Sequence, residues 1–410
     1  MGKKITRRQA ITRTSMALGG ALLGNLSPAL ALAAPTSAKP AYRPNILLLI
    51  ADGWSWQGSE AVDRLGLRMP TLARLQRDGI TFDNAFIGSP GAAPYPDLLE
   101  KGGYTVQRGT ANFAAFLDNR PAGKPFFFRF ESKGRKSSEK IDRDTAAITV
   151  PPYLPDTPTV RGDIAAYCSA IERFDHEAGR LIDRLERDGE LANTLIVMTG
   201  EGGWPFPRGR ETLYDAGNHV PLVAMYQGKI KGARVSKALV GSADLGSTFL
   251  DVAGITGPSK ASLMPLMLNG GDSAGRFVVT SRERATDGYP SSAIRTPQYL
   301  YISNAFPDRW PAGAPAQQAV TPAQLDSDVN AAFACIAPSP TKTAMIVGRG
   351  NPAMDRLIDL ATAKRPAAEL YDVHADPYQL TNLAADPAMK ALVTRLDKQL
   401  SRLTRNHGDT

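Results

Sequence analysis

The stretch that decides the fold is Asn45-Ile-Leu-Leu-Leu-Ile-Ala-Asp-Gly53, a continuous apolar run that ends in an acidic residue and a glycine. A strand that helices cover on both faces of a parallel sheet has such an unbroken run rather than an alternating pattern. Residues 45–50 are therefore predicted to form a buried strand. Asp52 follows at its carboxyl end, where α/β sheets bind ligands, and is a candidate functional residue.

The same pattern recurs along the chain. Residues 125–130 and 194–199 are also apolar runs and are predicted strands, while Glu201 follows the second of them. Helices are predicted over 70–79 and over 161–187, where apolar residues recur every three or four positions. Strand, helix and strand in this order predict an α/β fold with a mixed, mostly parallel sheet and helices on both faces.

Shorter elements follow in the last third of the chain. We expect strands at 277–280, 299–302 and 369–372, and a closing helix from about 387 to 403. These elements predict a small C-terminal α+β subdomain. The expected organisation is a linker at 34–44, a main α/β domain at 45–270 and the subdomain at 271–410.

Residues 1–33 have the pattern of a twin-arginine-like signal peptide. Basic residues, including Arg7 and Arg8, precede a short apolar stretch, and Ala31-Leu-Ala33 is the small-residue pattern that a signal peptidase accepts. We expect an exported protein, periplasmic or extracellular. The apolar stretch is shorter than the roughly 20 residues of a membrane span, so stable membrane insertion is not expected after leader removal.

Composition narrows the function further. The chain is 43% hydrophobic and 21% charged, as in globular proteins. The leader contains five basic and no acidic residues, so its removal lowers the formal net charge from +8 to +3 and gives no support to nucleic-acid binding. Cys168 and Cys335 fit no zinc or redox motif, and whether they form a disulfide is left open.

Several stretches together resemble the sulfatases of the alkaline-phosphatase-like superfamily, in particular heparan N-sulfatase (N-sulfoglucosamine sulfohydrolase). The resemblance rests on residues 43–52, on Ile80-Thr-Phe-Asp-Asn-Ala-Phe86, on Val150-Pro-Pro-Tyr-Leu-Pro-Asp-Thr-Pro158, on the segment 203–217, and on Glu369-Leu-Tyr-Asp-Val-His-Ala-Asp-Pro-Tyr-Gln-Leu-Thr-Asn-Leu383. It implies the alkaline-phosphatase-like sulfatase fold and the hydrolysis of sulfate esters or sulfamates, with a sulfated saccharide or another sulfated small molecule as the partner.

The resemblance also implies a calcium ion, whose family ligands are two Asp after the first strand and an Asp-Asn pair after a later one. Calcium prefers six to eight hard oxygen ligands. Here Asp52 matches the first ligand, but Gly53 replaces the second, and the later pair reads Glu201-Gly202. Asp52 and Glu201 are thus the candidate metal ligands. Arg210 matches a family cation that contacts the sulfate group and is the candidate substrate-binding residue.

The catalytic part of the resemblance is missing. Sulfatases convert the Cys or Ser of a Cys/Ser-x-Pro-x-Arg motif to formylglycine, yet this sequence contains neither Cys-x-Pro nor Ser-x-Pro. Only residues 87–94 stand between the family-like stretches that end at Phe86 and resume at Tyr95. The family's later Arg-Glu-Arg-His reads Arg282-Glu-Arg-Ala285 here. Formylglycine is therefore absent, and no catalytic residue is assigned.

Three functional interpretations follow. The chain is a sulfatase-family hydrolase with impaired catalysis, a non-catalytic protein that binds sulfated saccharide, or a hydrolase with a rebuilt metal site around Asp52, Glu201 and Arg210. The residues also allow structural roles. Asp52 could cap a turn, Glu201 and Arg210 could form a solvated surface pair of little energetic weight, and His219 is expected to be a packed residue at a strand edge.

One competing motif is interpreted as chance. Gly271-Asp-Ser-Ala-Gly275 matches the G-x-S-x-G elbow of α/β-hydrolases, which requires a strand before the serine and a helix after it. In this sequence the predicted strand, 277–280, comes after the motif. The order of elements is therefore the reverse of the one that the elbow needs.

Overall fold

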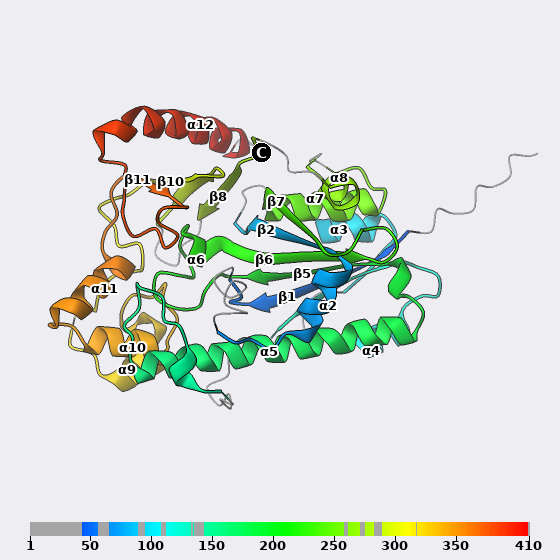
Figure 1. Ribbon diagram of the computed structural model, residues 1–410, viewed down its shortest axis with the longest axis horizontal. Coiled ribbons are helices and arrows are strands. Elements are labelled where there is room, and N and C mark those ends of the chain that lie inside the picture. Colours follow the sequence, from blue (N-terminus) through cyan, green and yellow to red (C-terminus); the bar gives the residue numbers. More distant parts are fainter. Residues whose placement is uncertain are drawn as a thin grey trace, which may run out of the picture. The chain divides into compact units, whose positions relative to one another are not determined.

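The computed structural model describes residues 43–55, 65–88, 95–107, 112–132, 134, 143–257, 261–270, 275–282, 289–316 and 318–408. The predicted leader, most of the short 87–94 join and Ser273 of the G-x-S-x-G motif lie outside these residues. Residues from Arg43 onward form one compact unit with two sheets (Figure 1). Among the described residues, no helix combines the length and apolarity needed to cross a bilayer.

The larger sheet has seven strands in the order β3-β4-β1-β5-β6-β2-β7. Their bounds are β1 Asn45–Asp52, β2 Ile80–Phe86, β3 Thr105–Gln107, β4 Phe126–Glu131, β5 Thr194–Glu201, β6 His219–Tyr226 and β7 Arg234–Gly241. β6 runs antiparallel to both of its neighbours, and the remaining pairs are parallel. The predicted mixed, mostly parallel sheet is confirmed.

Helices cover both faces of this sheet (Figure 1). α2 (Pro70–Asp78), α4 (Phe113–Asn119) and α5 (Pro158–Arg187) pack on one face, and α3 (Tyr95–Lys101), α7 (Ser242–Val252) and α8 (Met264–Asn269) pack on the other. In β1, Leu47 and Leu49 join the first core, whereas Ile46, Leu48 and Ile50 join the second. Burial of both faces explains why the strand has no polar alternation.

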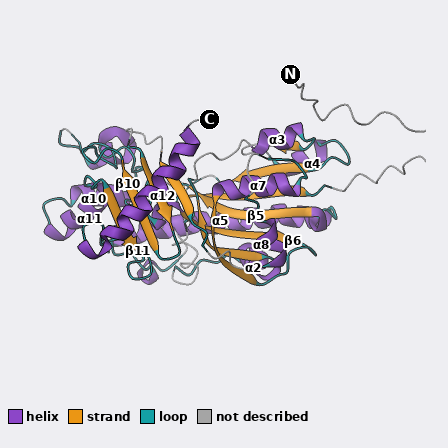
Figure 2. Ribbon diagram, turned by 90° about the horizontal axis from the view of Figure 1, so that it is seen from above, coloured by secondary structure: helices purple, strands orange, loops and turns teal. Residues whose placement is uncertain are grey.

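The smaller sheet is antiparallel, in the order β11-β10-β9-β8. Its strands are β8 Val278–Arg282, β9 Ser291–Arg295, β10 Tyr299–Asn304 and β11 Ala368–Asp372. The closing helix α12 (Lys390–Gly408) packs on it, and Figure 2 shows this sheet beside the larger one. The predicted C-terminal strands and closing helix are confirmed within a few residues.

Several further elements were not predicted from the sequence. Among them are the helices α6 (Asp215–Asn218), α9 (Pro322–Ser327), α10 (Pro340–Val347) and α11 (Pro352–Thr362), and the short 3-10 helices Thr145–Ala147, Leu191–Asn193, Val329–Ala331 and Pro387–Met389. α10 contacts α5, so this part of the C-terminal region packs against the main sheet's long helix.

Candidate functional site

Asp52 and Glu201 lie side by side at the carboxyl edge of the larger sheet. They are register partners at the ends of β1 and β5, and the Gly53 N–H donates to the Glu201 carbonyl at 2.7 Å. Their side chains are 44% and 54% exposed. The sequence prediction that both carboxylates belong to one site is therefore consistent with the positions of the strands.

Each carboxylate forms an ion pair with an arginine. Arg210 Nη2 donates to Asp52 Oδ1, and Arg129 Nη2 of β4 donates to Glu201 Oε2 at 2.9 Å. The interpretation of Glu201 and Arg210 as a surface pair is wrong, because Arg210 reaches Asp52 instead. The Asp52 N–H also donates to Ser132 Oγ at 3.1 Å. Asp52 is thus tied to Arg210 by its side chain and to Ser132 by its backbone.

A tight loop after β5 places Arg210 at this edge. The Trp204 N–H donates to the Ala216 carbonyl at 2.8 Å, and the Arg210 N–H donates to the Trp204 carbonyl at 2.7 Å. The buried Trp204 ring anchors the loop by packing edge-on against Tyr167 of α5, with 4.7 Å between ring centroids. The loop is therefore fixed to the core on both sides of Arg210.

The residues on either side of Arg210 have unusual backbone conformations. Arg208 has a φ of 68° and Glu211 a φ of 66°, a region that costs a side-chain-bearing residue roughly 1 to 3 kcal/mol. Arg208 is held by Nη1, which donates to the Leu360 carbonyl at 2.7 Å, and by stacking over the Tyr214 ring. Such strain persists where the surrounding structure fixes it, and it concentrates at functional sites.

These side chains line an open cavity of 450 Å³. Asp52, Glu201 and Arg210 lie on one side, and Arg282 from the end of β8 contributes the smaller sheet's part of the wall. The cavity therefore brings together all three of the site residues predicted from the sequence. It is large enough for a saccharide-sized ligand.

The residues at this edge do not fit a calcium ion of the sulfatase kind. Two carboxylates supply at most four oxygens, fewer than the six to eight that calcium takes, and each is already paired with an arginine. A Cβ at Gly134 would lie 2.5 Å from Asp52 Oδ2, so the chain covers that oxygen closely. Among the described residues, no group of three or more His, Cys, Asp or Glu could hold a metal ion.

Glycine at the two lost ligand positions matches the local backbone. Gly53 has a φ of 78° and Gly202 a φ of 76°, in the left-handed region that favours glycine. A Cβ at Gly202 would lie 2.8 Å from Arg210 Nη2. The glycine thus leaves room for the guanidinium that pairs with Asp52.

His219 is a packed residue, as expected. It begins β6, is 3% exposed and stacks on Phe86 with 4.5 Å between ring centroids. Its Nε2 lies 2.7 Å from the Asp83 carbonyl, and Nδ1 lies 3.5 Å from Asp215 Oδ2. Cys168 and Cys335 are both buried and do not form a disulfide, so the open question of a disulfide is answered.

Sequence reasoning missed Arg129 as a partner of this site. Arg129 is the charged residue within the phenylalanine-rich run 126–131, and its position near the carboxyl end of a predicted parallel strand was the available signal. Arg282 was noted only as part of a family motif. Its place in the cavity wall depends on how the smaller sheet packs against the larger one, which no local pattern reveals.

Comparison with known proteins gives consistent results. The family model described as Sulfatase matches residues 93–255. The chain is 25% identical over 282 residues to an ulvan-active sulfatase of Formosa agariphila, covering 67% of this chain and 43% of that protein. It is 27% identical over 286 residues to human N-sulphoglucosamine sulphohydrolase, covering 63% of this chain and 51% of that protein.

A solved structure supports the fold. A chain in complex with its substrate, D-glucosamine-2-N,6-O-disulfate, superimposes with a TM-score of 0.59 at 16% identity, covering 90% of this chain and 99% of that one. The chain spans about half the length of the curated relatives that it matches. Sequence matches and fold agree: the chain is similar to sulfatases and has the alkaline-phosphatase-like fold.

Proposed function

We propose that this sulfatase-like protein binds a sulfated saccharide in the 450 Å³ cavity but is impaired in hydrolysis. The observation that carries the proposal is that Asp52 is paired with Arg210, and Glu201 with Arg129, which also pairs with Glu131. Two carboxylates offer too few oxygens for a calcium site, whereas the arginine can still offer donors to an anion.

The ligand class is inferred from Arg210 and from the relatives. A guanidinium has five N–H donors, and the ion pair with Asp52 uses Nη2. Charge-assisted hydrogen bonds from arginine suit the oxygens of a sulfate group. One relative is named for N-sulphoglucosamine and a structural neighbour holds a glucosamine disulfate, which supports a sulfated amino sugar as the ligand.

Impaired hydrolysis is inferred from the sequence of the catalytic segment. The Cys/Ser-x-Pro-x-Arg motif is missing, so no formylglycine can form by that recognition rule. A single general acid or base contributes roughly 10²- to 10⁴-fold to a rate. Loss of the nucleophile together with most calcium ligands should therefore cost far more than one such group.

Binding is tested by calorimetric titration with an N-sulfated heparin disaccharide. The protein is expressed from the full sequence and purified after export. The mass of the purified protein shows in the same preparation whether residues 1–33 have been removed, as the leader pattern predicts. We expect saturable binding that Arg210→Met weakens by about tenfold or more, the effect of losing a hydrogen bond to a charged group. Arg395→Met, which removes an exposed arginine from α12, is the matched control and should bind like the wild type.

Two results would refute the binding proposal. The first is the absence of saturable heat with the disaccharide. The second is equal affinity in Arg210→Met and in Arg395→Met, because the ligand would then not be held at this cavity.

A further inference from the structure

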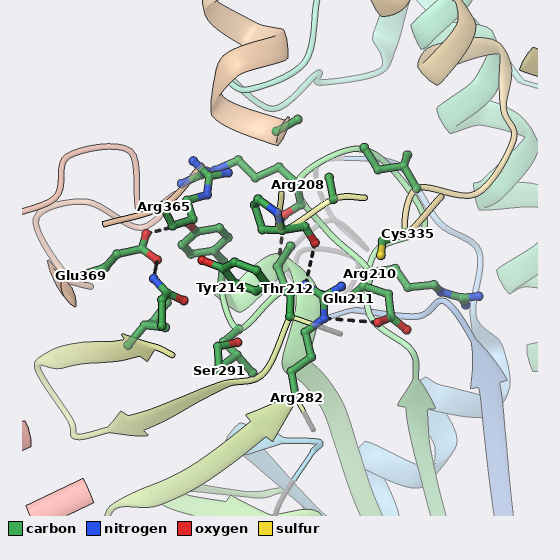
Figure 3. Close-up of a pocket in the computed structure, with 18 residues that line it drawn as sticks. Arg208, Arg210, Glu211, Thr212, Tyr214, Arg282, Ser291, Cys335, Arg365 and Glu369 are labelled. Atoms are coloured by element: carbon green, nitrogen blue, oxygen red, sulfur yellow. Dashed lines mark hydrogen bonds and ion pairs between the residues drawn. The ribbon is translucent and has the colours of Figure 1, made fainter. Parts of the chain in front are cut away.

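A second, smaller pocket adjoins the candidate site (Figure 3). Arg210, Glu211 and Arg282 line both cavities, whereas Arg208, Tyr289 and Arg365 line only the smaller one. Its volume is 40 Å³. A cavity needs roughly 10 to 15 Å³ to hold one water molecule. The pocket therefore has room for about three waters or for one small polyatomic ion.

The pocket has more positive than negative charge. Four arginines line it, but Glu211 and Glu369 are its only carboxylates among the described lining residues. Arg210 is paired with Asp52, and Arg282 Nε lies 3.3 Å from Glu211 Oε2. Glu369 is then the one carboxylate among the described lining residues that remains to balance the charges of Arg208 and Arg365. An uncompensated buried charge is costly, so the pocket favours a bound anion.

Glu369 is itself fully engaged by neutral donors. Its Oε2 accepts hydrogen bonds from the hydroxyls of Tyr214 at 2.7 Å and Tyr371 at 2.6 Å. Its Oε1 accepts one from Asn304 Nδ2 at 2.7 Å. In Figure 3, Glu369 lies on the side of Arg365 and away from Arg282.

Two buried side chains present donors that have no partner among the described residues. The Arg282 side chain is 8% exposed, and its Nη1 donates to the Pro311 carbonyl at 2.9 Å, while Nη2 has no hydrogen-bond partner in the described part of the chain. The Tyr289 hydroxyl is also buried and meets no partner within the described ranges, and the residue is 2% exposed. Burial raises the pKa of Tyr289 to about 12, so the hydroxyl keeps its proton and can donate. An unsatisfied buried donor costs roughly 1 to 3 kcal/mol.

We propose that this pocket binds one small tetrahedral oxyanion, of the size of sulfate, through Arg282 Nη2 and the Tyr289 hydroxyl. The oxygens of such an ion accept hydrogen bonds from both groups, and its charge offsets the excess of arginine. Waters would satisfy the donors but would leave the charge uncompensated. The proposal does not depend on saccharide binding at Asp52 and Arg210, because Tyr289 lines only the smaller pocket.

The oxyanion could be a free inorganic ion or a sulfate group on a saccharide in the adjoining cavity. Both present the same chemistry to Arg282 and Tyr289. Separate titrations with sodium sulfate and with an N-sulfated disaccharide distinguish the two sources. Either ligand supports the oxyanion site if its affinity depends on the Tyr289 hydroxyl.

The test is calorimetric titration of the full chain, with Tyr289→Phe as the main variant because it removes only one oxygen. We expect saturable binding of at least one of the two ligands, weakened about tenfold by Tyr289→Phe and at least as much by Arg282→Met. Arg395→Met should leave the affinity unchanged.

The proposal is overturned if neither ligand gives saturable binding, or if Tyr289→Phe binds both as the wild type does. Selenate-soaked crystals provide an independent measurement, since selenium scatters anomalously. Density beside Arg282 and Tyr289 is expected, and selenate found only beside Asp52 and Arg210 would contradict the proposal even if saccharide binding at that outer site were confirmed.

Discussion

Asp52 and Glu201 are each half-exposed, so their ion pairs contribute little to stability. Exposed pairs of this kind are typically worth 0 to 1 kcal/mol. A strongly coordinating metal could therefore displace Arg210 or Arg129. Calcium needs six to eight oxygen ligands, and the glycines at positions 53 and 202 have no side chain to supply one. This shortage of ligands, rather than the strength of the ion pairs, is the argument against a calcium site.

At this scale we predict that calcium does not stabilise the protein. A metal at 100 times its Kd would raise the free energy of unfolding by about 2.7 kcal/mol, which a melting curve detects readily. We expect no change in melting temperature with millimolar Ca²⁺ or Mn²⁺. A metal-dependent rise that Asp52→Asn abolishes would instead favour a hydrolase with a rebuilt metal site.

At the scale of elements, α10 contains a buried lysine, Lys342. Within the described residues, its ammonium group donates hydrogen bonds to backbone carbonyls and to no carboxylate. Lys342 is 1% exposed, and its Nζ donates to the carbonyls of Ile336 at 2.8 Å, Phe333 at 3.3 Å and Val329 at 3.5 Å. Burial lowers the pKa of Lys342 to about 8. The charged amine thus joins α10 to the preceding turn at a cost in desolvation.

This lysine predicts a pH dependence of stability. Below pH 8 the amine is charged in both states, and the folded state bears the full penalty, roughly 3 kcal/mol from the lowered pKa. Between pH 8 and about 10.5 the folded state loses its proton before the unfolded one, so stability rises with pH.

Urea unfolding of the wild type and of Lys342→Met at pH 7, 8, 9 and 9.5 measures this effect. The difference between their free energies of unfolding should shift in favour of the wild type above pH 8. A surface variant, Lys390→Met, should show no such change relative to the wild type. A constant difference between wild type and Lys342→Met would contradict the account of Lys342.

At the scale of the whole molecule, buried polar contacts join the two sheets. Arg295 of β9 donates to Asp215 of α6 at 3.2 Å. Burial alone would raise the pKa of Asp215, but Arg295 and His219 together hold it below its ordinary value. Asp163 of α5 accepts from the N–H of Thr341 at 3.0 Å and so ties α10 to the main sheet's long helix. The contact between Arg295 and Asp215 holds the smaller sheet, which contributes Arg282 to the cavity wall.

The sequence predicts the parts of this fold that have a strong local pattern. β1 and β5 are continuous apolar runs because both of their faces are buried, and the carboxyl ends of such strands place Asp52 and Glu201 at one edge. β9 has a mixed pattern, Ser-Ser-Ala-Ile-Arg, and gave no comparable signal.

The pairing of charges could not be predicted in the same way. Arg210 pairs with Asp52 and Arg129 with Glu201 across 158 and 72 residues of sequence, so the outcome depends on tertiary packing. The smaller pocket was likewise hidden, because Tyr289 and Arg208 meet only when the second sheet packs against the loop after β5.

The central claim is that this sulfatase-like site binds its ligand without hydrolysing it. The most direct measurement is hydrolysis of an N-sulfated heparin disaccharide by the full chain with Ca²⁺ present, beside a variant in which Asp52 and Glu201 are both alanine. The account predicts sulfate release at the rate of the protein-free blank for both proteins. Release above the blank by the wild type, and its loss in the double variant, would contradict the account.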